Sequence, residues 1–211
     1  MEITNVHNVP EPLVTLAKGQ YYSKGASQYS VTELMSPPRV RRLQEKHDAD
    51  RVQDVSQMLW PLLGSALHVV MERGETTGYV SEERIFAKVG DTTISGQIDL
   101  QEVSPFGITI IDYKFTSAYS VMAGKKEWER QLNCYAWLVE REKKIQVDGL
   151  EIYAIVRDWN RRKVGEANYP KTPIVKIPIT LWSFETRDEY VKRRVAYHTM
   201  ATENFICTAE D

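Results

Sequence analysis

Cysteine is scarce in this sequence, and so are long apolar runs. Only two cysteines, Cys134 and Cys207, occur among 211 residues. They are too few for an iron–sulfur cluster held by four thiolates and too far apart for a metal knuckle. The scarcity of cysteine predicts an intracellular protein with reduced thiols. The longest uncharged apolar segment, residues 58–71, is shorter than the roughly 20 residues that a bilayer requires. The first residues also lack the basic start and apolar stretch of a secretory signal, so we expect a cytoplasmic protein that does not enter a membrane.

Neither sign of charge is in excess. Lysine and arginine together number 27 and aspartate and glutamate 29, which gives a formal net charge of -2. The chain as a whole has no basic field, and contact with DNA would have to come from local patches. Basic residues gather at 39–46, 157–163 and 191–194, and Trp159 in the second segment could stack on a base. The sequence has no Walker A loop, which excludes an ATP-driven motor within it.

The first part of the chain predicts a loop followed by short helices. Residues 1–28 show no clear period and are typical of a loop with one short element at most. Ser30 and Glu33 have the spacing of a capping box, which starts a helix. Pro37 and the proline after it interrupt that helix, and a basic helix can resume beyond them.

A long helix is expected next. Between residues 52 and 73 apolar residues recur at spacings of three and four, with Pro61 as a possible kink and Gly74 as a stop. We expect a single domain over all 211 residues, with an N-terminal loop and helical extension at 1–51 and a core at 52–211.

The apolar period then changes from that of helices to that of strands. Gly90 and Asp91 separate two alternating runs, as in a tight hairpin with glycine at the first turn position. Ser104 to Gly107, "SPFG", predicts the next turn, and "ITIIDYKF" at 108–115 predicts a third strand. A three-stranded antiparallel meander results.

The rest of the chain continues with helices and strands. We expect a helix at 125–144, a buried strand at 150–156, an edge strand at 173–182 and a last helix, capped by Thr186 and Glu189, to about residue 201. The order predicts an α/β (α+β) fold, in which helices flank a central mixed sheet that contains the meander.

Two carboxylates and a lysine are the candidate catalytic groups. If Ser104 and Gly107 close an ordinary hairpin, paired positions have numbers that sum to 211, and Asp99 lies opposite Asp112. Carboxylates held about 4.5 to 5.5 Å apart repel each other unless a proton or a cation lies between them. Lys114, two residues beyond Asp112, projects from the same face. A β-bulge would shift this register, so the order of the strands is the firmer expectation.

Such a face suits metal-dependent hydrolysis of phosphodiesters. Magnesium prefers carboxylates and keeps several waters, and an ammonium group can hold or deprotonate one of those waters. The alternative is an ordinary ion pair between Asp112 and Lys114 on a solvated sheet. The apolar "ITII" before Asp112 favours a central strand over a solvated one.

Four motifs follow one another along the chain: His68 in "GSALHVVME", Asp99 in "GQIDL", Asp112 and Lys114 in "IIDYK", and Gln131 with Tyr135 in "QLNCY". With these motifs the sequence resembles the PD-(D/E)XK nuclease superfamily, and within it the RecB-like exonucleases of phage or CRISPR-associated type. The resemblance implies a restriction-endonuclease-like core. Phe115 departs from the pattern, because many relatives have a threonine after the lysine.

The resemblance also implies roles for these residues. His68, Asp99, Asp112 and the backbone carbonyl of Tyr113 would ligate one or two Mg²⁺ or Mn²⁺ ions, and Lys114 would position the attacking water. Gln131 and Tyr135 would complete the catalytic set, since residues four apart on a helix share a face. Considered one residue at a time, His68 or Tyr135 could instead be a core side chain, and Gln131 could be an ordinary solvent-exposed residue.

Two further acidic residues and several functions stay open. Glu82 and Glu83 are equal candidates for a supporting or second-metal carboxylate, and the sequence favours an ordinary surface position for each. The resemblance implies an exonuclease acting on single-stranded DNA or duplex ends in recombination, repair or phage DNA metabolism, with a recombination or replication protein as a candidate partner. A structure-specific or junction endonuclease and a non-catalytic DNA-binding module are the alternatives.

Overall fold

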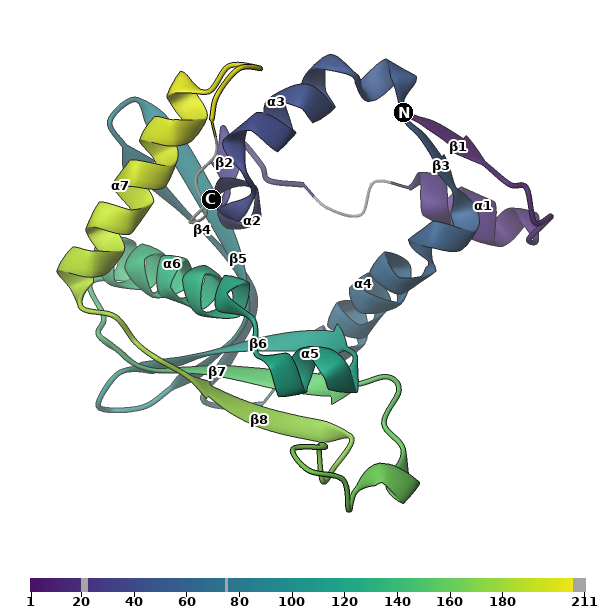
Figure 1. The fold of residues 1–211 in the computed structure, drawn as a ribbon. Helices are drawn as coiled ribbons and strands as arrows, with labels where there is room; N and C mark the ends of the chain where they lie inside the picture. Colours follow the sequence, from purple (N-terminus) through teal and green to yellow (C-terminus); the bar gives the residue numbers. More distant parts are fainter. Residues whose placement is uncertain (20–22, 75, 207–211) are drawn as a thin grey trace.

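The computed structural model describes residues 1–19, 23–74 and 76–206, and a mixed β-sheet forms its centre (Figure 1). The strands of this sheet follow the order β2-β5-β6-β7-β8, and β4 pairs with β5. They are β2 (Tyr29–Ser30), β4 (Tyr79–Val89), β5 (Thr92–Val103), β6 (Ile108–Thr116), β7 (Val147–Val156) and β8 (Ile174–Ile179). The expected mixed sheet flanked by helices is confirmed.

The meander forms as the turn residues predict. Val89 pairs with Thr92 across Gly90 and Asp91, and Gly90 has a φ of 59°, which glycine adopts without strain. Strands β5 and β6 pair from Leu100–Ile111 to Val103–Ile108, numbers that sum to 211, as expected.

Strand β6 is central, as its apolar sequence predicted. It pairs with β5 antiparallel on one side and with β7 parallel on the other. Its buried residues Ile108 and Ile110 belong to the main hydrophobic core. Strand β8 lies at the edge, antiparallel to β7.

Helix α6 (Lys126–Lys143) packs across the sheet, and α7 (Phe184–Met200) packs on the far side of α6 (Figure 1). Trp137 and Leu138 of α6 are completely buried. Gly96 of β5 makes this close approach feasible, because a β-carbon there would lie 2.7 Å from Leu138 and 2.8 Å from Tyr135. Glycine therefore fixes how deeply α6 packs against the sheet.

The N-terminal residues form more structure than the sequence indicated. Strand β1 (Glu2–Thr4) pairs in parallel with β3 (Val52–Asp54), and α1 (Glu11–Lys18) packs near them. Val14 and Ala17 of α1 form a small separate core with Val55. The expectation of one short element at most in residues 1–28 was therefore wrong.

The predicted helix at 52–73 is also shorter than expected. A strand and the 3-10 turn η2 (Val55–Met58) precede helix α4 (Leu59–Glu72). Asp54 caps η2 by accepting a hydrogen bond from the Ser56 amide, which favours a separate turn. Pro61 then falls in the first turn of α4, where its missing N–H costs no helical hydrogen bond, so no kink is needed.

The other helix boundaries follow local capping. Ser30 and Glu33 form the predicted capping box of α2 (Val31–Met35), and α3 (Pro38–Lys46) resumes beyond Pro37. The last helix begins earlier than expected, because Ser183 and not Thr186 is its N-cap. The short helix α5 (Ala118–Ala123) follows β6, and the turns η1 (Asp48–Asp50) and η3 (Arg161–Lys163) complete the elements.

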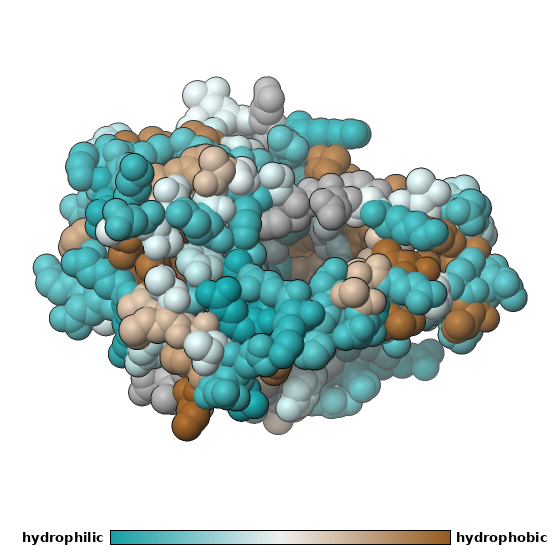
Figure 2. Space-filling model, turned by 90° about the horizontal axis from the view of Figure 1, so that it is seen from above, coloured by the Kyte–Doolittle hydropathy of each residue, from teal (hydrophilic) through white to brown (hydrophobic). Residues whose placement is uncertain are grey.

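Seen from above, the surface is mainly hydrophilic, with hydrophobic patches on the side of the N-terminal elements (Figure 2). Within the described residues, no helix is both long and apolar enough to span a bilayer.

Candidate active site

The site lies at the point where β5 and β6 separate, which we call the fork. Their pairing ends at Leu100 and Ile111, one step before Asp99 and Asp112. The Tyr113 amide donates a hydrogen bond of 2.8 Å to Oδ2 of Asp99. The predicted register is thus correct, but Asp99 and Asp112 lie just beyond the paired segment and not within it.

Helix α6 supplies a hydrogen-bonded network around Asp112. Oδ2 of the Asp112 carboxylate lies 2.7 Å from Nζ of Lys114, and Oδ1 accepts a hydrogen bond of 3.2 Å from Nε2 of Gln131. Oε1 of Gln131 accepts a bond of 3.0 Å from Lys114, and Nε2 also donates to the Tyr135 hydroxyl at 2.8 Å. The four predicted residues from β6 and α6 are therefore brought together.

A second group of side chains lies beside this network and consists of His68 from α4, Glu82 from β4 and Asp99 from β5. Nδ1 of His68 lies 3.4 Å from Oε1 of Glu82 and 3.5 Å from Oδ1 of Asp99. Ligand atoms of these three residues lie within 4.8 Å of one another, close enough to hold a metal ion. His68 is half-buried and faces carboxylates, so it is not a core side chain.

The structure separates Glu82 from Glu83. Glu82 has a φ of 51°, an unusual left-handed conformation within a strand, and its carboxylate reaches His68. Its other oxygen accepts a bond of 2.6 Å from Gln97. Glu83 instead pairs with Lys143 and accepts a bond from Gln101, away from His68. The sequence-based prediction treated the two glutamates as equal candidates, and only Glu82 lies in the candidate site.

Buried negative charge dominates the electrostatics. Burial, together with the nearby charge of Asp112, raises the pKa of Asp99 to about 8. Hydrogen bonding to Glu82, with the charges of Asp99 and Asp112, raises the pKa of His68. Asp112 is only 1% exposed, and within the described residues its Oδ2 forms no hydrogen bond but lies 2.7 Å from the Lys114 ammonium, with which it forms an ion pair.

These residues fit a divalent cation. Carboxylate oxygens and an imidazole nitrogen suit Mg²⁺ and Mn²⁺, and a buried carboxylate oxygen without a hydrogen bond is a natural ligand. The close cluster contains His68, Glu82 and Asp99, whereas the predicted ligand set had Asp112 and Tyr113 in place of Glu82. Asp112 stays next to the cluster, since its charge raises the pKa values of both Asp99 and His68.

A pocket opens beside Asp99. It has a volume of about 290 Å³, and Met71 of α4 lines it together with three tyrosines, Tyr79, Tyr113 and Tyr153. Tyr113 alternates with Asp112 and Lys114 along β6, so its side chain projects from the other face of the strand. The pocket therefore touches the carboxylate cluster at Asp99 and extends along the face of β6 that carries Tyr113.

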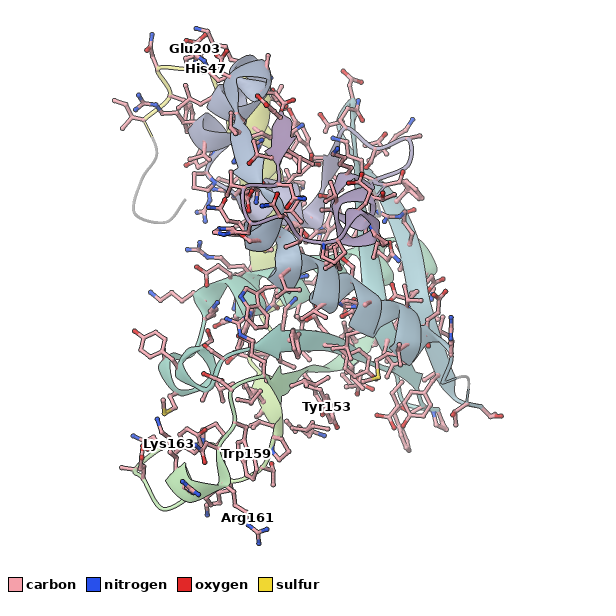
Figure 3. All side chains as sticks on the ribbon, turned by 90° about the vertical axis from the view of Figure 1, so that its right-hand side faces the viewer. His47, Tyr153, Trp159, Arg161, Lys163 and Glu203 are labelled. Atoms are coloured by element: carbon pink, nitrogen blue, oxygen red, sulfur yellow. The ribbon has the colours of Figure 1, made fainter. Side chains whose placement is uncertain are left out.

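The three basic segments differ in their partners. In 39–46, Arg41 and Arg42 pair with Glu45. In 191–194, Lys192 pairs with Asp188, and Arg194 is buried against backbone carbonyls. In 157–163, no basic side chain has an ion pair within the part of the chain that the structure describes. Figure 3 shows Arg161 and Lys163 pointing outward from this loop.

Trp159 and Cys134 do not contribute to the site. The Trp159 indole donates to the carbonyl of Pro170, and its ring packs in a small core below β7 (Figure 3). Burial raises the pKa of Cys134 to about 12, so its thiol stays protonated. Cys207 lies outside the described residues.

The fold and the residues gathered at the fork define a metal-dependent nuclease. A family model of the PD-(D/E)XK nuclease superfamily matches residues 29–205, and the chain belongs to this superfamily. The chain is also similar to a solved structure described as "Crystal structure of SSO0001", with a TM-score of 0.58 and 20% identity over 88% of this chain and 84% of that one. At this identity the likeness supports the fold alone. No curated protein matches the sequence significantly.

Proposed function

We propose that this protein is a RecB-like deoxyribonuclease that removes nucleotides from DNA ends, using Mg²⁺ or Mn²⁺. The observation that carries the proposal is the convergence of His68, Glu82, Asp99, Asp112 and Lys114, from α4, β4, β5 and β6, on one fork of the sheet. Burial of acidic groups costs free energy that a bound cation would offset, and groups with strongly shifted pKa values gather at functional sites.

The residues take distinct roles in this proposal. His68, Asp99 and Asp112 hold the ion, with Glu82 and the Tyr113 carbonyl as further ligands. The bound ion supplies Lewis acidity and lowers the pKa of water. Lys114 orients the attacking water.

Gln131 is a positioning residue that joins Lys114, Asp112 and Tyr135 through hydrogen bonds. Because it bonds to both Lys114 and Asp112, it fixes their relative orientation. Tyr135 in turn anchors the Gln131 amide.

DNA is the proposed substrate because the basic side chains at 157–163 form no ion pair within the part of the chain that the structure describes, and the choice of DNA ends follows the resemblance to the RecB-like exonucleases. Such groups suit a phosphate backbone. We propose that the protein works in the cytoplasm as one domain, in recombination, repair or phage DNA metabolism and alongside a recombination or replication protein.

A substrate panel tests this function. Purified protein is incubated with end-labelled linear and with circular DNA, single- and double-stranded, in Mg²⁺, Mn²⁺ or chelator. We expect metal-dependent loss of linear DNA with circles intact. Nicking of circles would instead indicate an endonuclease, and binding without any cleavage would indicate a passive DNA-binding module.

A further inference from the structure

An aromatic cluster lies at the end of β6, next to the candidate catalytic lysine. Phe115 directly follows Lys114, so the two Cα atoms are only about 3.8 Å apart although the two side chains project from opposite faces of β6. The ring of Trp60, in the first turn of α4, lies 6.5 Å from that of Phe115 between centroids, tilted by 42°. The guanidinium of Arg157, just beyond β7, lies 4.4 Å from the centroid of the Trp60 ring.

This cluster is not a core. Trp60 is 49% exposed, although tryptophan is the largest apolar side chain. Tyr119 of α5, the helix after β6, is exposed as well. Within the described residues Arg157 forms no ion pair, so its guanidinium keeps its charge available while it stacks on the indole.

The two residue types favour one kind of ligand. An exposed indole binds flat, polarisable rings, and a guanidinium beside it binds phosphate. An unpaired nucleotide offers both groups. Bases in a duplex are stacked on one another, and their faces are not accessible to a protein ring.

We propose that Trp60, Phe115 and Arg157 form a stacking platform for an unpaired base of single-stranded DNA next to the cleavage position. The platform rests on the proposed function for its place beside the cleavage site. It also explains Phe115, since an aromatic ring at this position contributes a stacking surface where a threonine would contact phosphate.

Binding assays separate this platform from catalysis. Fluorescence anisotropy measures the affinity for a labelled single strand, for the same strand with abasic sites and for a fully paired duplex without a loop, with Ca²⁺ in place of Mg²⁺. We expect Trp60→Ala to weaken binding of the intact strand by about five- to 150-fold, because stacking on one aromatic ring contributes that much. Binding of the abasic strand and of the duplex should change by less than about twofold.

Two variants serve as controls. Trp60→Phe keeps an aromatic ring and should retain most of the affinity. Phe106→Ala removes an aromatic side chain that is 87% exposed at the opposite end of β6, and it should have no effect. Since Trp60 and Phe106 are both exposed, the variants should fold, and circular dichroism verifies this.

The outcomes distinguish the platform from the nuclease. Unchanged binding of the intact strand by Trp60→Ala, an equal loss on intact and abasic strands, or no single-strand binding by the wild type would each refute the platform. If the predicted pattern is found but the substrate panel shows no cleavage, the proposed nuclease function is wrong and the platform stands as a binding site.

Discussion

The two helices that bring residues to the fork differ sharply in packing. Nine residues of α6 are buried, including Leu132 at 0% exposure, and α6 contacts every strand from β4 to β8. None of the residues of α4 is buried, although most of them are apolar, and Leu63 is 40% exposed. Gln131 and Tyr135 thus lie on a firmly packed helix, and His68 and Trp60 on a loosely packed one.

This difference in packing suits the two helices to different roles in the site. Exact orientation of the lysine needs rigid support, which buried packing provides. A helix with few buried contacts has low local stability and can adjust to an ion or a DNA strand. We infer that the α6 side of the site is preformed and that the α4 side responds to what binds.

The largest expected effect is on the preformed side. Lys114→Met removes the ammonium that lies 2.7 Å from Asp112 and keeps a chain of similar length. Cleavage should fall by about 10²- to 10⁴-fold, the usual range for a positioned acid–base group. Initial rates on linear DNA in Mg²⁺ measure it.

Lys126→Met is the matched control, since Lys126 is an exposed lysine in the first turn of α6. It should cleave at the wild-type rate. Equal rates for Lys114→Met and the wild type would remove Lys114 from the site.

The same substitution on both helices measures the packing difference directly. Leu132→Ala on α6 should lower the free energy of unfolding by about 2–5 kcal/mol, because it leaves a cavity in a closed core. Leu63→Ala on α4 should cost less than about 1 kcal/mol, because 40% of that residue is already exposed to water and no closed core surrounds it. Urea unfolding followed by circular dichroism gives both values, and similar losses would contradict the comparison.

The packing difference also explains which predictions succeeded. The sequence patterns predicted the β5–β6 register and α6 correctly, because alternation and helical spacing are strong where one face is buried. The helix at 52–73 was predicted wrongly for the converse reason. Apolar residues recur there at helical spacing, but Val52 to Asp54 pair with β1 and the Asp54 cap starts a separate turn.

Glu82 could not be distinguished from Glu83 in the sequence. Regular alternation would place neighbouring residues on opposite faces, and it gives no reason to choose between them. What brings Glu82 to His68 is a left-handed residue inside β4, and no glycine or asparagine in the sequence signals it. A local backbone exception beside a catalytic cluster is the kind of feature that pattern reading misses.

The smallest expected effect is on the free energy of unfolding, which the burial of the acidic cluster lowers. The pKa of Asp99 rises from 3.8 unfolded to about 8 folded, so the folded state binds the proton more tightly. The stability that this gives is complete below pH 3.8 and is lost as the pH rises towards 8. The raised pKa of His68 acts in the same direction. Without metal, the wild type should therefore become less stable from about pH 4 to pH 8.

Asp99→Asn tests this point, because asparagine is neutral and still accepts the Tyr113 hydrogen bond. In chelator the variant should melt above the wild type at about pH 8, by about 2–4 °C for each 1 kcal/mol of repulsion removed, and the gain should vanish near about pH 4. Added Mg²⁺ or Mn²⁺ should reverse the order at the higher pH, because only the wild type keeps the full carboxylate set and metal binding displaces the proton. If Asp99→Asn instead lowered the melting temperature in chelator at that pH, burial of Asp99 would not be costly, and the argument that a cation offsets it would fail.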